Sequence, residues 1–149
     1  MVDTGDIDRA QDSPAGWVAD HVRRYVETGG AEGHEWKPGV PTLVLATTGR
    51  RSGQPRRTGL IYGRDGEDFV VIASKGGAPE HPAWYTNLQA DPQAAIQVGE
   101  DRFQVLARTA DVDEKARLWP QMARVWPDYD TYMRKTDRDI PVVLLQRTA

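Results

Sequence analysis

Six short apolar segments, each flanked by residues typical of turns, set the main limit on how this chain can fold. Asp65-Gly66 and Gly99-Glu100-Asp101 join two pairs of neighbouring segments, and such tight turns favour hairpins with antiparallel pairing. Helical stretches lie between the other segments. We therefore expect an α+β fold with about six mostly antiparallel strands in a closed sheet and helices packed outside it. The expected strands are 42–48, 57–62, 69–73, 94–98, 103–109 and 141–145.

Start and stop signals predict where the helices lie. Ser13-Pro14 offers a cap and a first-turn proline, and Gly29-Gly30 ends the apolar spacing that begins there. Pro82 opens a short helix. The pair Asp111 and Glu114 caps a longer one, and a last helical segment follows from residue 128.

Composition indicates one globular domain. The chain has 149 residues, of which 39% are hydrophobic and 28% charged, as in an ordinary single-core protein. Residues 1–13 are polar and acidic, so we expect a flexible N-terminal tail ahead of a domain over 14–149 that includes the N-terminal helix. The lack of cysteine excludes disulfides, thiolate metal sites and cysteine nucleophiles, and it fits a cytoplasmic protein. The three histidines are scattered, so no metal site is expected.

Positive charge is concentrated in one window. Residues 36–64 hold six basic and no acidic side chains, which leaves −9 for the rest of a chain whose net charge is −3. Within this window the arginine turn (residues 49–57) places four arginines around two glycines. Glycines let backbone N–H groups converge and arginine forks pair with phosphate or carboxylate, so the turn predicts a site for a defined anion. The alternative is an exposed hairpin whose arginines only keep a sheet edge soluble.

Two further polar segments follow the third expected strand. Hairpin pairing of the second and third strands would bring Lys75 beside Arg56 and Arg57 at one anionic site. The alternative is a surface lysine in a turn before a helix. In that helix Trp84 fits a core position, whereas Asn87, one turn later, is placed to hold the polar edge of a ring.

An aromatic stripe marks the last helical segment. Trp126, Tyr129, Tyr132 and Met133 lie around the break at Pro127 and follow helical spacing beyond it. Such a stripe either packs into a core or forms a movable wall over a flat, apolar substrate. Both interpretations stay open from the residues alone.

Five segments in order, 47–56, 73–79, 81–88, 126–129 and 135–141, resemble the deazaflavin-dependent nitroreductase family. The resemblance implies a split β-barrel similar to the FMN-binding flavin oxidoreductases, with residues 14–149 as one F420-binding domain. It implies coenzyme F420 as cofactor, an 8-hydroxy-5-deazaflavin with a phosphate and an oligoglutamate tail. It also implies an F420-dependent reductase, nitroreductase- or quinone reductase-like, that transfers a hydride to a nitroaromatic, quinone or enone-type small molecule.

The resemblance also assigns roles to residues. It implies phosphate contacts from the arginine turn with Lys75, and ring contacts from the segment after the third strand. Ser74 and Tyr132 are the expected catalytic donors to negative charge that builds on a substrate oxygen. Many relatives carry tyrosine where this chain has Trp126. The implied cofactor-binding residues are Arg50, Arg51, Ser52, Gly53, Gln54, Pro55, Arg56, Thr58, Ala73, Ser74, Lys75, Gly76, Gly77, Ala78, Trp84 and Asn87, and the implied substrate-binding residues are Trp126, Tyr129, Tyr132 and Met133.

Other functions stay open at this point. An FMN-dependent split-barrel reductase would share the fold, and a non-catalytic F420 carrier would keep the arginine turn without an open ring face. Nucleic-acid binding is not expected, because the rest of the chain is acidic. A homodimer is left open. Peripheral membrane contact through the apolar face of the N-terminal helix is also left open, against packing of that helix on the barrel.

Overall fold

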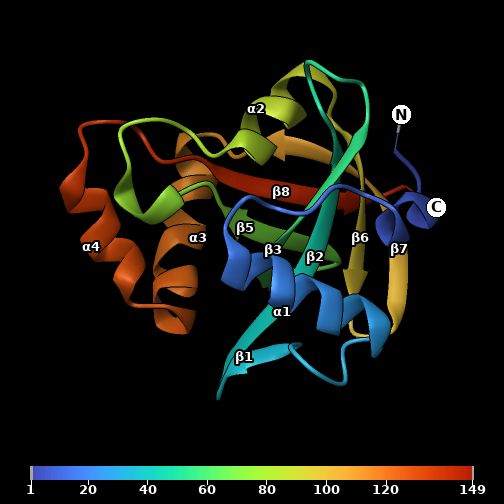
Figure 1. Cartoon of the computed structure of the whole chain (residues 1–149). Coiled ribbons are helices and arrows are strands. Elements are labelled where there is room, and N and C mark those ends of the chain that lie inside the picture. Colours follow the sequence, from blue (N-terminus) through green and yellow to red (C-terminus); the bar gives the residue numbers. More distant parts are fainter. Residues whose placement is uncertain (1, 149) are drawn as a thin grey trace.

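A curled antiparallel sheet of eight strands forms the centre of the computed structural model, which describes residues 2–148 (Figure 1). The strands are β1 (Glu35–Lys37), β2 (Val40–Thr48), β3 (Pro55–Ile61), β4 (Gly63–Asp65), β5 (Asp68–Ile72), β6 (Gln93–Val98), β7 (Asp101–Thr109) and β8 (Val142–Arg147). They follow the order β1-β2-β6-β7-β8-β5-β4, and β3 pairs with β2 outside this series. The expected α+β split barrel is confirmed. The short strands β1 and β4 add to the six that the sequence predicts.

Helices cover the sheet on several sides. They are α1 (Gly16–Glu27), α2 (Ala83–Ala90), α3 (Val112–Val125) and α4 (Asp128–Lys135), with 3-10 turns η1 (Thr4–Asp8) and η2 (Lys75–Gly77). In Figure 1, α1 crosses the front, α2 lies at the top, and α3 and α4 lie at the left. The expected capping box starts α3, since the carboxylates of Asp111 and Glu114 each accept the other residue's backbone N–H. Within residues 2–148, no helix has the length and hydropathy needed to cross a membrane.

The N-terminal segment is packed, so the expected flexible tail is wrong for residues 2–13; residue 1 lies outside the described residues. Val2 and Ile7 are 2% and 0% exposed and join the main core. The backbone of Gln11 extends the edge of β3, donating to the Pro55 carbonyl at 3.0 Å and accepting from the Arg57 N–H at 2.9 Å. Residues 1–13 are polar on average, so their composition does not reveal these few apolar side chains, which cover strands of the barrel.

One predicted hairpin has different partners in the structure. The sequence pattern pairs residues 57–62 with 69–73, but β3 pairs with β2, from Thr42 opposite Ile61 to Thr48 opposite Pro55. Only the short strand β4 forms the hairpin with β5. The pairing of β2 with β3 is longer than that of β4 with β5, and it forms because the arginine turn connects β2 and β3 directly. Strand pairing therefore does not bring Lys75 beside the arginines.

Two apolar clusters hold the helices on the sheet. The larger cluster joins α1, α2 and the N-terminal segment to the strands. The smaller packs Leu118, Trp119 and Met122 of α3, with Tyr129 of α4, against Val70 and other residues of β5 and β8. This packing fixes α4 beside the residues that follow β5.

Candidate functional site

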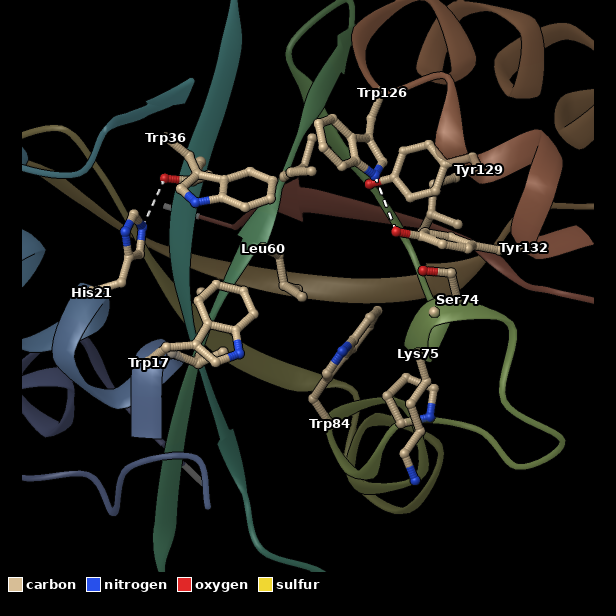
Figure 2. Close-up of a pocket in the computed structure, with 17 residues that line it drawn as sticks. Trp17, His21, Trp36, Leu60, Ser74, Lys75, Trp84, Trp126, Tyr129 and Tyr132 are labelled. Carbon is tan, nitrogen blue, oxygen red and sulfur yellow. Dashed lines mark hydrogen bonds between the residues drawn. The ribbon is translucent and has the colours of Figure 1, made fainter. Parts of the chain in front are cut away.

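A pocket of about 380 Å³ lies where α1, β1, α2 and α4 approach one another over β3 (Figure 2). Its floor is formed by Gly59, Leu60 and Ile61 of β3, with Ile72 at the end of β5. Lys75 is the charged side chain in the lining. The aromatic walls are Trp17, Trp36, Trp84, Trp126, Tyr129 and Tyr132.

The structure brings together some of the predicted site residues and separates others. Those that line the pocket are Ser74, Lys75, Gly76, Trp84, Trp126, Tyr129 and Tyr132. The arginine turn lies outside the lining, beside α2, and Met133 is exposed on α4. Thr58, Ala73, Gly77, Ala78 and Asn87 also lie outside it. The expected ring and substrate contacts therefore meet at the pocket, whereas the expected phosphate contacts lie apart from them.

The arginine turn combines a closed backbone with exposed side chains. The Gly49 N–H donates to the Gln54 carbonyl and the Gly53 N–H to the Gly49 carbonyl, both at 2.8 Å. The Ser52 hydroxyl accepts from the Gln54 N–H at 3.1 Å. The exposed arginines are Arg50, Arg51 and Arg56. Guanidinium groups on a fixed frame are well suited to hold an anion.

Asn87 ties the arginine turn to α2. Its Oδ1 accepts from the backbone N–H and from Nη1 of Arg50, at 3.2 and 3.0 Å, and its Nδ2 donates to the Thr47 hydroxyl at 3.1 Å. The side chain is buried, so its amide serves the turn rather than an open edge of the pocket. Trp84 lies one helical turn earlier and lines the pocket, so α2 connects the two sites.

Arg57 does not belong to the exposed arginines, which corrects the expectation that it joins Lys75 at an anionic site. Its side chain is only 8% exposed. Its Nε donates to the Asp12 carboxylate at 2.7 Å and its Nη1 to the Ile7 carbonyl at 3.0 Å. The guanidinium therefore holds the N-terminal segment on β3 and is not available to a ligand.

The residues after β5, which we call the 74–77 turn, form a concave backbone site. Ser74 is right-handed helical, with φ −82° and ψ −38°, and Lys75, Gly76 and Gly77 follow with φ of 46°, 63° and 82°. Such a change of hand makes successive N–H groups converge as an anion-binding nest. In the described part of the chain, the N–H groups of Ser74, Lys75 and Gly76 have no protein acceptor. The Lys75 ammonium pairs with Glu80 at 2.8 Å, which lowers the pKa of the Glu80 carboxyl.

The tyrosines of α4 form the opposite wall. The Trp126 Nε1–H donates to the Tyr132 hydroxyl oxygen at 3.3 Å. The Tyr129 ring meets that of Tyr132 edge to face, with centroids 6.1 Å apart. Burial raises the pKa of Tyr129 well above its ordinary value, so its phenol stays protonated. This wall therefore presents apolar ring faces together with hydroxyl groups.

The first third of the chain supplies part of the pocket that sequence reasoning missed. Trp17 is 65% exposed and stacks on Trp36, with their ring centroids 6.0 Å apart. The ring centroids of Trp36 and Trp126 are 5.1 Å apart. We call these three side chains the tryptophan row (Figure 2). A signal was present in the sequence, because Trp17 flanks the apolar face of its helix and Trp36 falls in an expected loop. An exposed tryptophan such as Trp17 commonly marks a binding surface.

His21 is the titratable group on the α1 side of the pocket. Its Nε2 lies 3.3 Å from the Thr42 hydroxyl, which itself donates to the Gly33 carbonyl at 2.7 Å. Burial lowers the pKa of His21 below its ordinary 6.5, so the ring is neutral at pH 7. No three metal-ligating side chains gather anywhere in residues 2–148.

Comparison with known proteins gives this arrangement a family. The family model described as F420H(2)-dependent quinone reductase matches residues 17–147. The chain belongs to the F420H(2)-dependent quinone reductase family. This membership confirms the expected F420-dependent reductase and its cofactor over the FMN alternative.

Individual members of the F420H(2)-dependent quinone reductase family and solved structures are similar over most of the chain. The F420H(2)-dependent quinone reductase Rv1261c of Mycobacterium tuberculosis (strain ATCC 25618 / H37Rv) is 41% identical over 135 residues, which cover 85% of this chain and 87% of that protein. A solved F420-H2 dependent reductase is 34% identical with a TM-score of 0.66, covering 71% of this chain and 94% of that one. A structure described as a domain-swapped dimer is 33% identical with a TM-score of 0.69, covering 90% of this chain and 100% of that one.

Proposed function

We propose that this protein reduces quinones with reduced F420, and that the pocket between α1 and α4 receives the quinone ring. One observation carries the proposal: aromatic side chains surround a pocket that also offers backbone N–H groups without protein acceptors. Aromatic walls favour a flat, apolar ring, and the N–H donors favour an oxygen on which negative charge builds. Nitroaromatics and enones share these features and are proposed as further acceptors.

The donor set of the chain suits F420. The phosphate and carboxylates of this cofactor call for several cationic donors, which the arginine turn offers in Arg50, Arg51 and Arg56, with Ser52 as a hydroxyl donor. Lys75, whose pair with Glu80 is exposed, would supply a further cation on the pocket side. The deazaflavin ring would border the 74–77 turn and Trp84. When bound in its reduced form, F420 supplies a hydride, two electrons at once.

The chain's own part in the reaction is to orient the quinone and to donate hydrogen bonds. The tryptophan row and Tyr129 hold the ring and exclude water. The Tyr132 hydroxyl accepts from Trp126, so its own hydrogen is free to meet a quinone oxygen. The Ser74 hydroxyl is a second donor in the lining. A proton from either donor would complete the hydroquinone.

The full chain should be titrated with oxidised F420 and, in parallel, with FMN, following tryptophan fluorescence. Reduced F420 is then mixed with a naphthoquinone, a nitroaromatic and an enone in separate reactions. We expect tighter binding of F420 than of FMN and the fastest turnover with the quinone. Tighter binding of FMN would overturn the cofactor assignment. Binding of F420 without turnover of any acceptor would favour the carrier alternative.

Assembly and location are separate proposals. A similar solved structure is described as a domain-swapped dimer, which supports a homodimer for this chain. Light scattering on the purified protein would test it, because a dimer and a monomer of 16.6 kDa differ twofold in mass. A cytoplasmic location stays a prediction.

A further inference from the structure

Arg138, between α4 and β8, forms hydrogen bonds to backbone carbonyls in the 74–77 turn and on either side of it. Its Nη1 donates to the Ala73 carbonyl at 3.1 Å, its Nη2 to the Ser74 carbonyl at 2.9 Å, and its Nε to the Ala78 carbonyl at 3.1 Å. Nη1 also lies 2.9 Å from Nδ1 of His81. One guanidinium fork thus binds both ends of the turn.

Because the peptide bond is planar, the hydrogen bonds from Arg138 to these carbonyls also fix the direction of the N–H groups that follow them. In a trans peptide the C=O and the following N–H point in opposite directions. Arg138 binds the carbonyls of Ala73 and Ser74, so the N–H groups of Ser74 and Lys75 point away from it. Ser74, Lys75 and Gly76 line the pocket, whereas Arg138 does not. The N–H groups of Ser74 and Lys75 therefore lie on the side of the turn away from Arg138, and these two residues line the pocket.

The charge of Arg138 strengthens these donors. No carboxylate lies within ion-pair distance of its guanidinium in residues 2–148, so its contacts are carbonyl oxygens and a histidine nitrogen. A cation bound to a carbonyl polarises that peptide group and makes its N–H a better donor, as in a cooperative hydrogen-bond chain. The peptides that Arg138 binds at Ala73 and Ser74 are those whose N–H groups belong to the nest.

We propose that Arg138 is a positioning residue for the reaction: it fixes and polarises the Ser74 and Lys75 N–H groups toward a ring oxygen that gains negative charge during reduction. This inference rests on the proposed function. The oxygen belongs either to the deazaflavin ring or to the quinone, and the two sources give different results in the test. Arg138 touches neither ring and acts through the turn.

The first measurement needs no cofactor. Amide resonances of Ser74 and Lys75 are compared by NMR in the unsubstituted chain, Arg138→Met, Arg138→Lys and the control Arg134→Met. Arg134 is an exposed arginine in the last turn of α4, and within residues 2–148 its side chain donates only to the Thr131 hydroxyl, at 3.4 Å. We expect both amides to move upfield in Arg138→Met, to move less in Arg138→Lys, and to stay in place in Arg134→Met. Unmoved amides in both Arg138 variants would overturn the proposal, and Arg138→Lys decides if the methionine variant fails to fold.

The second measurement locates the charge. If the oxygen is on the quinone, Arg138→Met lowers kcat about 10–100-fold while the Kd of F420 stays near that of Arg134→Met. If it is on the cofactor, Arg138→Met weakens binding of reduced F420 more than that of oxidised F420. In either case Arg138→Lys recovers part of the loss. A kcat and both Kd values equal to those of Arg134→Met would overturn the role in the reaction. Failure of the unsubstituted chain to bind F420 would instead overturn the proposed function, and the amide shifts would still decide whether Arg138 orients the turn.

Discussion

The indole N–H of Trp126 donates to the hydroxyl oxygen of Tyr132 across 3.3 Å, and this bond sets the direction of the tyrosine's own hydrogen. A hydroxyl that already accepts one hydrogen bond keeps a donor for another partner. Both side chains line the pocket, so we expect that partner to be a ligand oxygen.

Replacing Tyr132 should therefore change turnover and leave cofactor binding nearly intact. We expect Tyr132→Phe to lower kcat about tenfold or more, because one donor to developing charge is lost. Trp126→Phe keeps an aromatic ring but loses the N–H, so its effect should be smaller. Steady-state kinetics with a quinone and fluorescence titration with F420 provide the two readouts. Equal losses of turnover and of cofactor affinity would place Tyr132 in the scaffold.

Replacing two adjacent arginines of β3, Arg56 and Arg57, should change different properties of the protein: F420 binding in one case and stability in the other. Arg56 is exposed, so Arg56→Ala should weaken F420 binding by about 1.5–3 kcal/mol, the range for hydrogen bonds to charged groups, without changing stability. Arg57 is buried against Asp12 and the Ile7 carbonyl, so Arg57→Ala should lower the free energy of unfolding by a similar amount. Fluorescence titration and urea unfolding of both variants separate the effects. Unchanged F420 affinity in Arg56→Ala would contradict an anion site at this residue.

Two neighbouring glycines test how closely the 74–77 turn packs on α4. A Cβ at Gly77 would lie 2.8 Å from the Tyr132 carbonyl oxygen and 3.0 Å from the Lys135 Cβ, whereas a Cβ at Gly76 would meet nothing within 4 Å. Both residues have positive φ. Gly76→Ala should thus lower the free energy of unfolding by about 1 kcal/mol and Gly77→Ala by about 3 kcal/mol, because α4 must also move.

Urea unfolding compares the stability of the two glycine variants. Gly77→Ala should in addition raise the KM for quinone, since Tyr132 moves with α4. Matching stabilities and matching KM values would show that the turn and the helix are independent.

His81 should make stability depend on pH. Burial, and then the charge of Arg138, lower the pKa of His81 below 6.5, while Asp139 opposes them. The folded chain therefore binds fewer protons than the unfolded chain just below pH 6.5, and stability falls as the pH drops through that range. Asn at this position offers an acceptor to Arg138 but cannot titrate.

The free energy of unfolding of the unsubstituted chain and of His81→Asn should be measured from pH 7.5 to pH 5. We expect the two curves to run parallel above pH 7 and the unsubstituted chain to lose more stability below pH 6.5. His21 titrates in both proteins, so the difference isolates His81. Parallel curves throughout would mean that the histidine keeps its ordinary pKa.

Local signals in the sequence predicted those parts of the site that depend on neighbours in the chain. The arginine turn needs its own glycines, and the α3 cap needs Asp111 and Glu114 at fixed spacing, so both could be read from the residues. The 74–77 turn is also local, and its glycines mark it. The exposed state of Arg56 and the buried state of Arg57 were not separable, because they depend on the N-terminal segment.

Contacts between distant segments could not be predicted from one sequence. Hairpin rules offer β3 two neighbours in the chain, β2 and β5, whereas the pairing of β5 with β8 joins segments that lie far apart in the chain. Trp36 was assigned to a loop because three residues of strand leave little periodicity. Arg138 lies in a segment that carries the family resemblance, yet its partners are about 60 residues earlier in the chain, so its role needed the structure.

The tryptophan row joins the first and the last third of the chain at one pocket. A molecule seated there binds only when both parts are in place, so the folded state gains about 2.7 kcal/mol at a ligand concentration one hundred times its Kd. The rise in the melting temperature of the protein therefore reports how far the pocket is occupied, without a colour change or a reaction. A library of ring compounds can be ranked by such heating curves, and a turnover assay on the compounds that bind then divides them into inhibitors and substrates.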